Sequence, residues 1–470
     1  MGVVGAVLFL VWINFAPFLA RLALGERFGR PLDGGATAWD GQPILGPHKT
    51  WRGIAVGVAA GALAGPLLGV GAAAGAAAGL AAMAGDLATS FLKRRLKYPS
   101  GLPRAGLDQF LEGVLPLAVL YPSLELGPWQ ALLALSLFFP LSFAGSAFWH
   151  YVLYRPSGGG YPRIVRATTR LREWRACHAP LARWQTWLNF ESYVYYRVVM
   201  ARVFRLLGWY ERGVANVLAV RVRPVELEFP DLPGAFEGYR VLLLTDLHLD
   251  GVPALTETLV EQVQGCEVDL CLVGGDVRME MYGPMAPALR HLRRLLGHVR
   301  ARDGVFGVLG NHDCIEMLPE FEAAGVTMLV NEARELRRGG DAVWLVGVDD
   351  PHYYRCHDLP LAFRKVPGNA FTLFLAHSPE VYREAAGHGA RVYLCGHTHG
   401  GQICLPRIGP LFTHSHAPRF TAAGPWEYRG MVGYTSRGAG ASGVPVRFHC
   451  PGEIPLITLR RVSAPGAYKG

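Results

Sequence analysis

Long apolar runs dominate the first 150 residues of the chain, whereas short apolar runs alternate with polar segments after residue 155. The first run, GVVGAVLFLVWINFAPFLA, is long enough to cross a bilayer, and it lacks the charged segment that precedes the apolar core of a secretory signal. Further apolar stretches cover roughly residues 54–92, 107–126 and 128–150. The stretch 54–92 is too long for one crossing at about 1.5 Å per residue. We divide it near Gly69–Gly71 and predict five membrane-spanning helices.

Basic residues cluster between these predicted helices. One cluster follows the first helix, another lies near residues 93–104, and a third begins at Arg155. Five spans with the N-terminus outside place all three clusters in the cytoplasm, as the positive-inside rule requires, whereas four spans do not. We therefore expect a multi-pass protein of the inner or cell membrane whose C-terminal part faces the cytoplasm. The run GVGAAAGAAAGLAAMAG has small residues at i, i+4 spacing, which suits close helix packing but is also ordinary membrane sequence.

Five short apolar runs in the second half each end in polar residues. They are VLLLTDLHLD, DLCLVGGDVR, VFGVLGNHD, FTLFLAHSPE and ARVYLCGHTHG. Runs of this length, apolar throughout, are typical of strands buried on both faces. The pattern predicts an α/β domain whose functional site lies at the carboxyl ends of the strands.

The polar residues at these strand ends are of the types that bind metal ions. Oxygen and imidazole ligands without a thiolate favour Mn²⁺, Fe or Zn²⁺ over Ca²⁺. Seven such side chains exceed the needs of one ion but suit two ions that share a bridging carboxylate. The predicted ligands are Asp246, His248, Asp276, Asn311, His377, His397 and His399.

The composition of the chain favours a location at a membrane surface. The chain has 51% hydrophobic and 18% charged residues, and its net charge of +9 suits an anionic membrane surface. Nucleic-acid binding would explain the charge equally well, but no nucleic-acid-binding motif accompanies it, so we expect no nucleic-acid partner. The eight cysteines form no CxxC pair, which favours reduced thiols over a disulfide framework. The oligomeric state is not encoded in any of these patterns.

The motif set DLH…GD…GNHD…H…GHTH strongly resembles the calcineurin-like metallophosphoesterase superfamily over residues 236–462. The resemblance implies a four-layer αββα sandwich with two metal ions. It implies that Asp246, His248, Asp276 and His399 hold the first ion, and that Asp276 bridges to a second ion held by Asn311, His377 and His397. It further implies that His312 binds phosphate and protonates the leaving group, oriented by Asp313.

Other segments are similar to the membrane-associated branch of that superfamily. They are NEAREL, VGVDDP and YTSRGAGASGVPVRF. That branch includes UDP-2,3-diacylglucosamine pyrophosphohydrolase-type enzymes, which split a lipid-linked diphosphate. One departure is GDVRME, because many relatives carry a further aspartate shortly after GD. The loop residues His352, His357, His414 and His416 either line a substrate pocket or are solvated.

Two polar blocks interrupt the apolar half, GPHKTWRG and GDLATSFLKRRLKYPSGLPRAGLDQFLEG. Their carboxylates and basic groups suit Mg²⁺ and a nucleoside triphosphate, or the basic residues serve as orientation signals and pair with Asp86. The blocks resemble the CDP-archaeol synthase family, which transfers CMP from CTP to a lipid phosphate with Mg²⁺. Leu111 stands where that family usually has a second aspartate, and the adjacent Glu112 is a substitute. The candidate site comprises Lys49, Arg52, Asp86, Lys93, Arg94, Asp108 and Glu112.

These patterns predict three regions: an all-α, multi-span membrane domain (1–152), a linker with amphipathic helices (153–235) and a phosphoesterase domain (236–470). The aromatic and arginine-rich linker helix either lies in the headgroup region or packs on the following domain. We expect a metal-dependent hydrolase of a phospholipid or lipid-linked diphosphate. The alternatives are that the membrane half is an inactive anchor, or that it is the principal enzyme, a CTP-dependent cytidylyltransferase, with the phosphoesterase as a second or regulatory activity.

Overall fold

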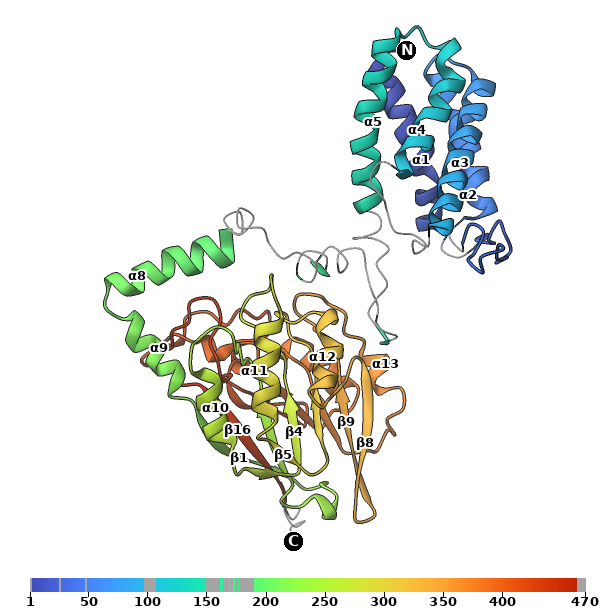
Figure 1. Cartoon of the computed structure of the whole chain (residues 1–470). Coiled ribbons are helices and arrows are strands. Elements are labelled where there is room, and N and C mark those ends of the chain that lie inside the picture. Colours follow the sequence, from blue (N-terminus) through green and yellow to red (C-terminus); the bar gives the residue numbers. More distant parts are fainter. Residues whose placement is uncertain are drawn as a thin grey trace. The chain divides into compact units, whose positions relative to one another are not determined.

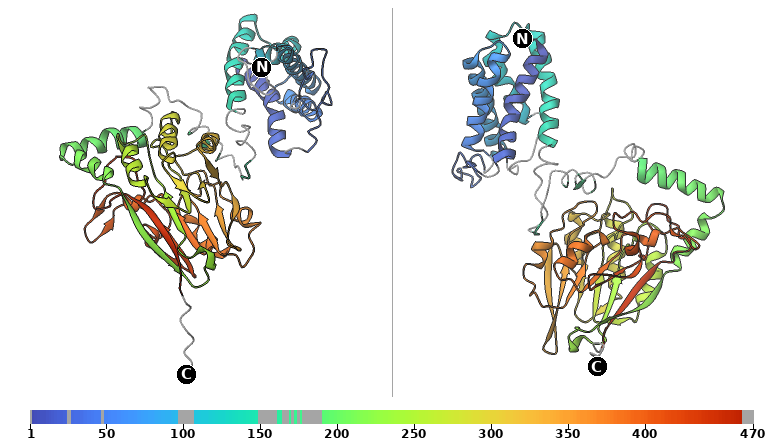
Figure 2. Two further views of the ribbon diagram at one scale, coloured as in Figure 1. Left: turned by 60° about the horizontal axis from the view of Figure 1, so that its bottom comes forward. Right: turned by 180° about the vertical axis from the view of Figure 1, so that it is seen from behind.

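The computed structural model describes residues 2–462 except 25–26, 47–48, 97–106, 149–160, 164–168, 170–171, 174–175 and 177–189. The chain divides into two compact units, Met1–Arg155 and Pro156–Gly470. Each unit is described by itself (Figures 1 and 2).

The first unit is helical and follows the predicted apolar runs. The break between the second and third helices falls at residues 68–71, where the sequence analysis divides the long apolar stretch. Three of the described helices contain segments long and apolar enough to cross a membrane: Val3–Arg21, Ala72–Arg95 and Pro128–Ser146. The number of spans and their orientation stay predictions. The helices are α1 (Val3–Leu24), α2 (Trp51–Leu67), α3 (Ala72–Arg95), α4 (Leu107–Leu120) and α5 (Pro128–Phe148).

Glycines bring α2 and α3 into backbone contact. A Cβ added to Gly61 would lie 2.1 Å from the carbonyl oxygen of Gly75, and one added to Gly75 would lie 2.2 Å from the carbonyl oxygen of Gly61. Gly79 faces Gly57 in the same way, at 2.4 Å. Only glycine permits this approach, so the small-residue run serves close helix packing, as one of its two interpretations predicted.

The second unit contains two six-stranded sheets. Four of the five neighbour pairs in the first sheet are parallel, and β16 and β2 are antiparallel. In order across the sheet, its strands are β1 (Arg221–Phe229), β16 (Glu453–Arg461), β2 (Arg240–Leu244), β4 (Leu270–Val273), β6 (Val305–Gly307) and β7 (Val326–Met328). The second sheet consists of β14 (Gly424–Tyr428), β15 (Met431–Thr435), β11 (Val392–Cys395), β10 (Thr372–Leu375), β9 (Asp341–Gly347) and β8 (Glu332–Arg338). Two short pairs are β3 (Glu267–Val268) with β5 (Arg300–Ala301), and β12 (Cys404–Leu405) with β13 (Gly409–Pro410).

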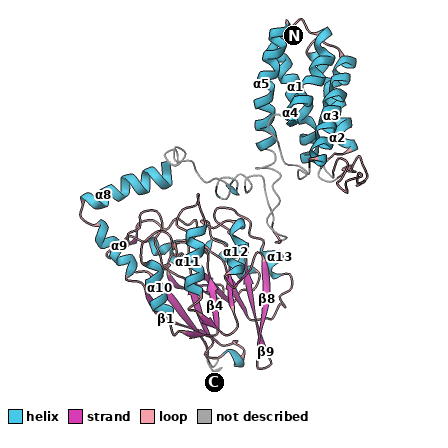
Figure 3. Ribbon diagram, viewed as in Figure 1, coloured by secondary structure: helices cyan, strands magenta, loops and turns pink. Residues whose placement is uncertain are grey.

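The two sheets pack face to face over an apolar core that includes Leu243, Leu272, Leu345 and Leu373. Helices α10 (Leu255–Val263), α11 (Ala286–Leu296) and α12 (Leu318–Ala323) cover the outer face of the first sheet (Figure 3). Helices α13 (Leu359–Phe363) and α14 (Tyr382–Gly387) pack on the second sheet. The expected four-layer αββα arrangement is therefore present.

The region between the halves contributes more structure than the sequence analysis expects of a linker. Strand β1 lies within residues 153–235, yet it pairs with β16 over its whole length. A helical segment, η4 (Phe190–Met200), continues as α8 (Ala201–Leu206), and α9 (Tyr210–Leu218) follows. Ala201 and Phe204 are buried against Val444 and Val446, so one face of the α8 segment packs on the phosphoesterase unit.

Candidate metal centre

The predicted ligands follow β2, β4, β10 and β11 at their carboxyl ends, with Asn311 in the loop after β6. All of them are buried. Parallel strands direct their carboxyl ends to the same edge, and the two packed sheets bring these edges together. Five of the seven ligands have positive φ angles, a conformation that non-glycine residues adopt rarely and that clusters at functional sites. They are Asp246 (51°), His248 (42°), Asp276 (56°), His397 (72°) and His399 (51°).

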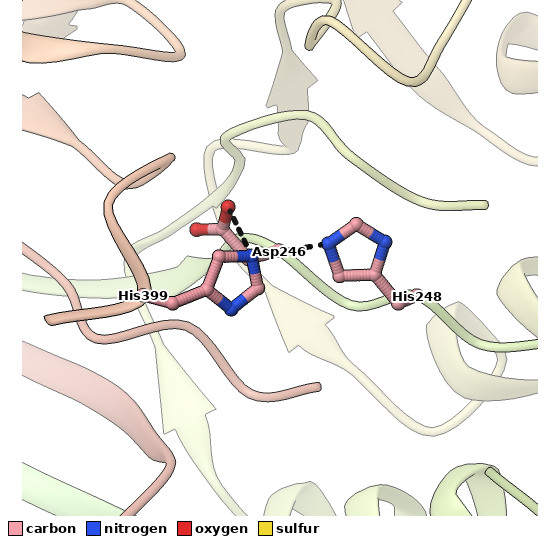
Figure 4. A group of neighbouring side chains, drawn as sticks. All are labelled: Asp246, His248 and His399. Carbon is pink, nitrogen blue, oxygen red and sulfur yellow. Dashed lines mark hydrogen bonds and ion pairs between the residues drawn. The ribbon is translucent and has the colours of Figure 1, made fainter. Parts of the chain in front are cut away.

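One group consists of Asp246, His248 and His399 (Figure 4). The two Nε2 atoms face each other at 3.2 Å, and Asp246 Oδ1 lies 3.5 Å from His399 Nε2. His248 donates its Nδ1 proton to the carbonyl oxygen of Arg278 at 2.8 Å, which leaves a lone pair on Nε2. Gly396 makes room for this group, since a Cβ there would lie 2.1 Å from Asp246 Oδ2.

A second group consists of Asp276, His377 and His397, with Asn311 beside it. His377 donates Nδ1–H to the Gly274 carbonyl at 2.8 Å, and its Nε2 lies 3.3 Å from Asp276 Oδ2 and 3.0 Å from Asn311 Oδ1. The Nδ1 atom of His397 is 2.8 Å from Asn311 Oδ1. Asp276 Oδ2 also lies 3.8 Å from His248 Nε2, so this carboxylate stands between the two groups.

The electrostatics fit divalent cations. Burial lowers the pKa of His248 to about 3 and holds the pKa of His399 well below its ordinary value, so these rings are neutral. At His377 burial is outweighed by Asp276 and neighbouring carboxylates, which raise the pKa to about 10. Neutral imidazoles at His248 and His399, together with carboxylates that favour a positive charge at His377, are the donor set of a cation site. Two bound divalent ions would supply water activation and charge neutralisation at a phosphate.

His312 lies beside this centre, but Asp313 does not orient it as expected. The His312 ring donates Nδ1–H to the carbonyl of Met279 at 2.7 Å. Its Nε2 lies 3.9 Å from Asp276 Oδ2, so it is turned toward the centre. The buried Asp313 carboxylate instead accepts hydrogen bonds from backbone amides, because it closes the turn between two ligand loops. The donors are Asp276, Val277 and Gly310.

Two buried arginines that the sequence analysis does not single out support the ligand loops. Arg278 Nε donates to the carbonyl of His312. Arg447 donates to the carbonyls of Arg437 and Gly440, and its guanidinium lies 3.3 Å from His399 Nδ1. One sequence signal could have identified Arg447: it is an arginine in a segment otherwise rich in small and apolar residues, GVPVRF.

The structure places part of the predicted nucleotide site together in the membrane unit. Lys49 Nζ contacts both carboxylate oxygens of Asp86, at 2.6 and 2.7 Å. Lys93 and Arg94 are buried on α3, and Glu112 lies on α4. Arg52 donates a hydrogen bond to the Arg27 carbonyl. Asp108 is in the first turn of α4, and its side chain lies outside the described residues.

Comparison with known proteins agrees with this geometry. Residues 239–401 match the model of the calcineurin-like phosphoesterase family, and residues 3–73 match that of CDP-archaeol synthase. An uncharacterized metallophosphoesterase of Helicobacter pylori is 31% identical over 276 residues, covering 54% of this chain and 68% of that protein. The phosphodiesterase YaeI of Escherichia coli is 28% identical over 230 residues, covering 47% of this chain and 82% of that protein.

Among solved structures, the chain is similar to an intramembrane enzyme of archaeal membrane lipid biosynthesis. The identity is 33%, the match covers 29% of this chain and 90% of that one, and the TM-score is 0.26. The fold and the site together define a metal-dependent phosphoric ester hydrolase. The chain belongs to the metallophosphoesterase family, and a CDP-archaeol synthase-like region precedes its phosphoesterase domain.

Proposed function

We propose that this protein hydrolyses a phospholipid or a lipid-linked diphosphate, such as UDP-2,3-diacylglucosamine, at the cytoplasmic surface of the membrane that holds its first unit. The seven predicted ligands bind two divalent ions, Mn²⁺, Fe or Zn²⁺, and His312 protonates the leaving group. An apolar surface beside the metal centre supports a lipid substrate over a soluble one.

Exposed apolar side chains are concentrated at that surface. Within the described part of the second unit, the exposed large apolar residues fall in only two segments, 195–209 and 405–420. The two segments adjoin: Phe448 stacks on Phe204 at 5.9 Å, and its carbonyl accepts a hydrogen bond from Cys404. The second segment also reaches the metal centre, since His397 Nε2 is 3.0 Å from the His414 carbonyl.

This apolar surface has the composition of an interfacial membrane contact. Ile408 is 69% and Phe412 is 71% exposed at the hairpin that follows the GHTHGG segment, and Leu206, the last residue of α8, is 86% exposed. The arginines at 202, 205 and 407 lie exposed among them, where they suit anionic headgroups. The uncovered face of the α8 segment thus fits the headgroup-region interpretation, while its other face packs on the domain.

Replacing Ile408 and Phe412 together by serine tests the lipid assignment. Burying two such side chains in lipid contributes about 1.5–3 kcal/mol each. We therefore expect the rate on a phospholipid in vesicles to fall about tenfold or more, with the rate on bis-p-nitrophenyl phosphate in solution changed less than about twofold. Equal rates for the variant and the wild type on vesicles would remove the support for a lipid substrate. An unchanged melting temperature is the folding control.

A second candidate function is CTP-dependent cytidylyl transfer in the first unit, with Mg²⁺ as cofactor. The match of residues 3–73 to the CDP-archaeol synthase model supports it. The Lys49–Asp86 contact is compatible with it and also with the alternative in which a basic residue simply pairs with Asp86. If the unit is active, the full-length protein forms a CDP-lipid from CTP and phosphatidate with Mg²⁺, and Lys49→Ala reduces this about 100-fold by removing a charged contact to the nucleotide. If wild type and variant form none, the unit is an anchor.

A further inference from the structure

One hydroxyl group beside the metal centre belongs neither to the ligand set nor to the hydrogen bonds of its own loop. Ser442 lies in the loop between β15 and β16, and its side chain is partly buried. Its Oγ atom is 3.5 Å from His312 Nε2, which is the one partner of this hydroxyl among the described residues. Serine hydroxyls in loops usually bond the nearby backbone. A hydroxyl directed at the candidate catalytic ring therefore points to a role in the reaction.

The loop that carries Ser442 is fastened to one of the ligand loops. The amide of Gly440 donates to the carbonyl of Asp246 at 2.7 Å. Only glycine permits this approach, because a Cβ added to Gly440 would lie 2.2 Å from the carbonyl oxygen of Leu247. The loop is thus held against the chain that follows β2.

Gln402 fixes the backbone of Ser442 itself. Its Oε1 atom accepts a hydrogen bond from the Ser442 amide at 2.9 Å, and its Nε2 atom donates to the carbonyls of Ser442 and Val444, at 3.0 and 2.7 Å. Gln402 directly follows the GHTHGG segment. The loop that carries His397 and His399 therefore also positions Ser442.

The outer side of the Ser442 loop is covered by η4 and α8. A Cβ added to Gly443 would lie 3.0 Å from Tyr196 Cδ1, and Val444 belongs to the apolar cluster of the α8 segment. The backbone at Ser442 thus has fixed neighbours on both sides. Little reorganisation is needed for its hydroxyl to bind a ligand, which favours binding.

The contact between Ser442 and His312 is longer than an ordinary hydrogen bond. Such bonds join heavy atoms at about 2.7–3.2 Å, whereas Ser442 Oγ and His312 Nε2 are 3.5 Å apart. Two polar atoms at this separation can both bond a third atom at about 2.8 Å from each. His312 Nε2 is also turned toward the centre, 3.9 Å from Asp276 Oδ2. In the proposed reaction, the atom that His312 serves is the leaving-group oxygen.

A purely orienting role for Ser442 explains the contact less well. The His312 ring is already fixed at Nδ1, which donates to the Met279 carbonyl at 2.7 Å. A hydroxyl bonded permanently to Nε2 would compete with the substrate for the atom that the reaction uses. A weak contact that is exchanged for one with the substrate avoids this competition.

We propose that Ser442 is a further catalytic residue, whose hydroxyl donates a hydrogen bond to the leaving-group oxygen beside His312. Negative charge develops on that oxygen as its bond to phosphorus breaks, and a fixed donor stabilises this charge more than it stabilises the ground state. Ser442 keeps its proton throughout and forms no covalent bond. The inference rests on the phosphoesterase function proposed above and adds a residue to its machinery.

The test compares two soluble substrates of similar shape, diphenyl phosphate and bis-p-nitrophenyl phosphate, with the full-length protein and Mn²⁺. Phenolate is the more basic leaving group and gains more from a hydrogen bond to its oxygen. Ser442→Ala should lower kcat about tenfold or more on diphenyl phosphate and less than about threefold on bis-p-nitrophenyl phosphate, with KM changed little on either. Ser442→Thr, which keeps the hydroxyl, should retain most of the kcat on diphenyl phosphate.

A second measurement separates direct contact with the substrate from an effect through His312. In a His312→Gln background, Ser442→Ala should still lower kcat on diphenyl phosphate about tenfold, because the hydroxyl bonds the leaving group itself. Disappearance of the Ser442→Ala effect in this background would overturn the direct contact and make Ser442 a residue that only orients His312.

The control is Thr258→Val, since the Thr258 hydroxyl bonds the Ala254 carbonyl at the start of α10, and this variant should change neither rate. Equal losses in Ser442→Ala on both substrates, or no loss on either, would overturn the inference while leaving the phosphoesterase function in place. A lower metal content in Ser442→Ala would overturn it in favour of a structural role. Absence of cleavage of both substrates by the wild-type protein would instead refute the phosphoesterase function itself.

Discussion

Asp276→Asn should lower kcat of the phosphoesterase about 1000-fold or more. Asp276 Oδ2 lies 3.3 Å from His377 Nε2, 3.8 Å from His248 Nε2 and 3.9 Å from His312 Nε2, so one carboxylate serves both ligand groups. In the proposed two-metal centre, losing this charge would remove the carboxylate shared by the two ligand groups. Metal ions contribute several kcal/mol to stabilising such a transition state, and about 4 kcal/mol corresponds to a factor of 1000 in rate. Steady-state rates with saturating Mn²⁺ and the bound metal content per chain measure the effect.

Asparagine is chosen because it keeps the shape of the site. Its side-chain oxygen still accepts the hydrogen bond that the His312 amide donates to Asp276 Oδ1 at 2.8 Å. The matched control is Asp231→Asn, where a half-exposed carboxylate contacts Arg391 and should contribute little to either activity or stability. A variant that keeps more than a tenth of the wild-type rate, with two ions bound, would contradict the bridging role.

His312→Gln should slow the reaction by an amount that depends on the leaving group. The ring is fixed by the Met279 carbonyl and directs Nε2 toward the centre, which suits an acid that protonates the departing oxygen. Such catalysis contributes about 100- to 10000-fold. An alcohol leaving group needs this proton, so its rate should fall about 100-fold or more. A p-nitrophenolate leaving group is stable without it, and its rate should fall less than about tenfold.

The ratio of the two rates is the decisive quantity. His298→Gln on the surface should leave both rates unchanged, and the wild-type circular dichroism spectrum should be kept by both variants. If His312→Gln slowed both substrates equally, His312 would act in binding phosphate and not as the acid.

Five strands of the phosphoesterase unit, β2, β4, β6, β10 and β11, were predictable because each is a short apolar run followed by polar residues. Their distribution between two sheets was not. Strands β4 and β10 are each buried on both faces, although they lie in different sheets. Because their side chains are all apolar, the sequence does not specify the strand with which each one pairs. Strand β1, with the sequence RVRPVELEF, was assigned to the linker because it carries many polar residues. Its pairing with β16, which makes it an edge strand, is visible only in the folded structure.

The seven candidate ligands could be selected by residue type, because histidine, aspartate and asparagine recur at five strand ends. The structure gathers them into two neighbouring groups, and their binding of metal stays a prediction. The groups that orient those side chains were not predictable. His248 and His377 are fixed by the backbone carbonyls of Arg278 and Gly274, which every sequence possesses and which only the fold brings to the right place. The family resemblance implied Asp313 as the partner of His312, whereas the structure provides the Met279 carbonyl.

The central claim is that a two-metal centre on a membrane-bound chain cleaves lipid phosphates. It is tested most directly by incubating the purified full-length protein, reconstituted in vesicles, with a lipid-linked diphosphate and Mn²⁺, and by measuring the released phosphate monoester. The account predicts release that stops with a chelator and is absent in Asp276→Asn. No release by the wild-type protein, or undiminished release by Asp276→Asn, would contradict it.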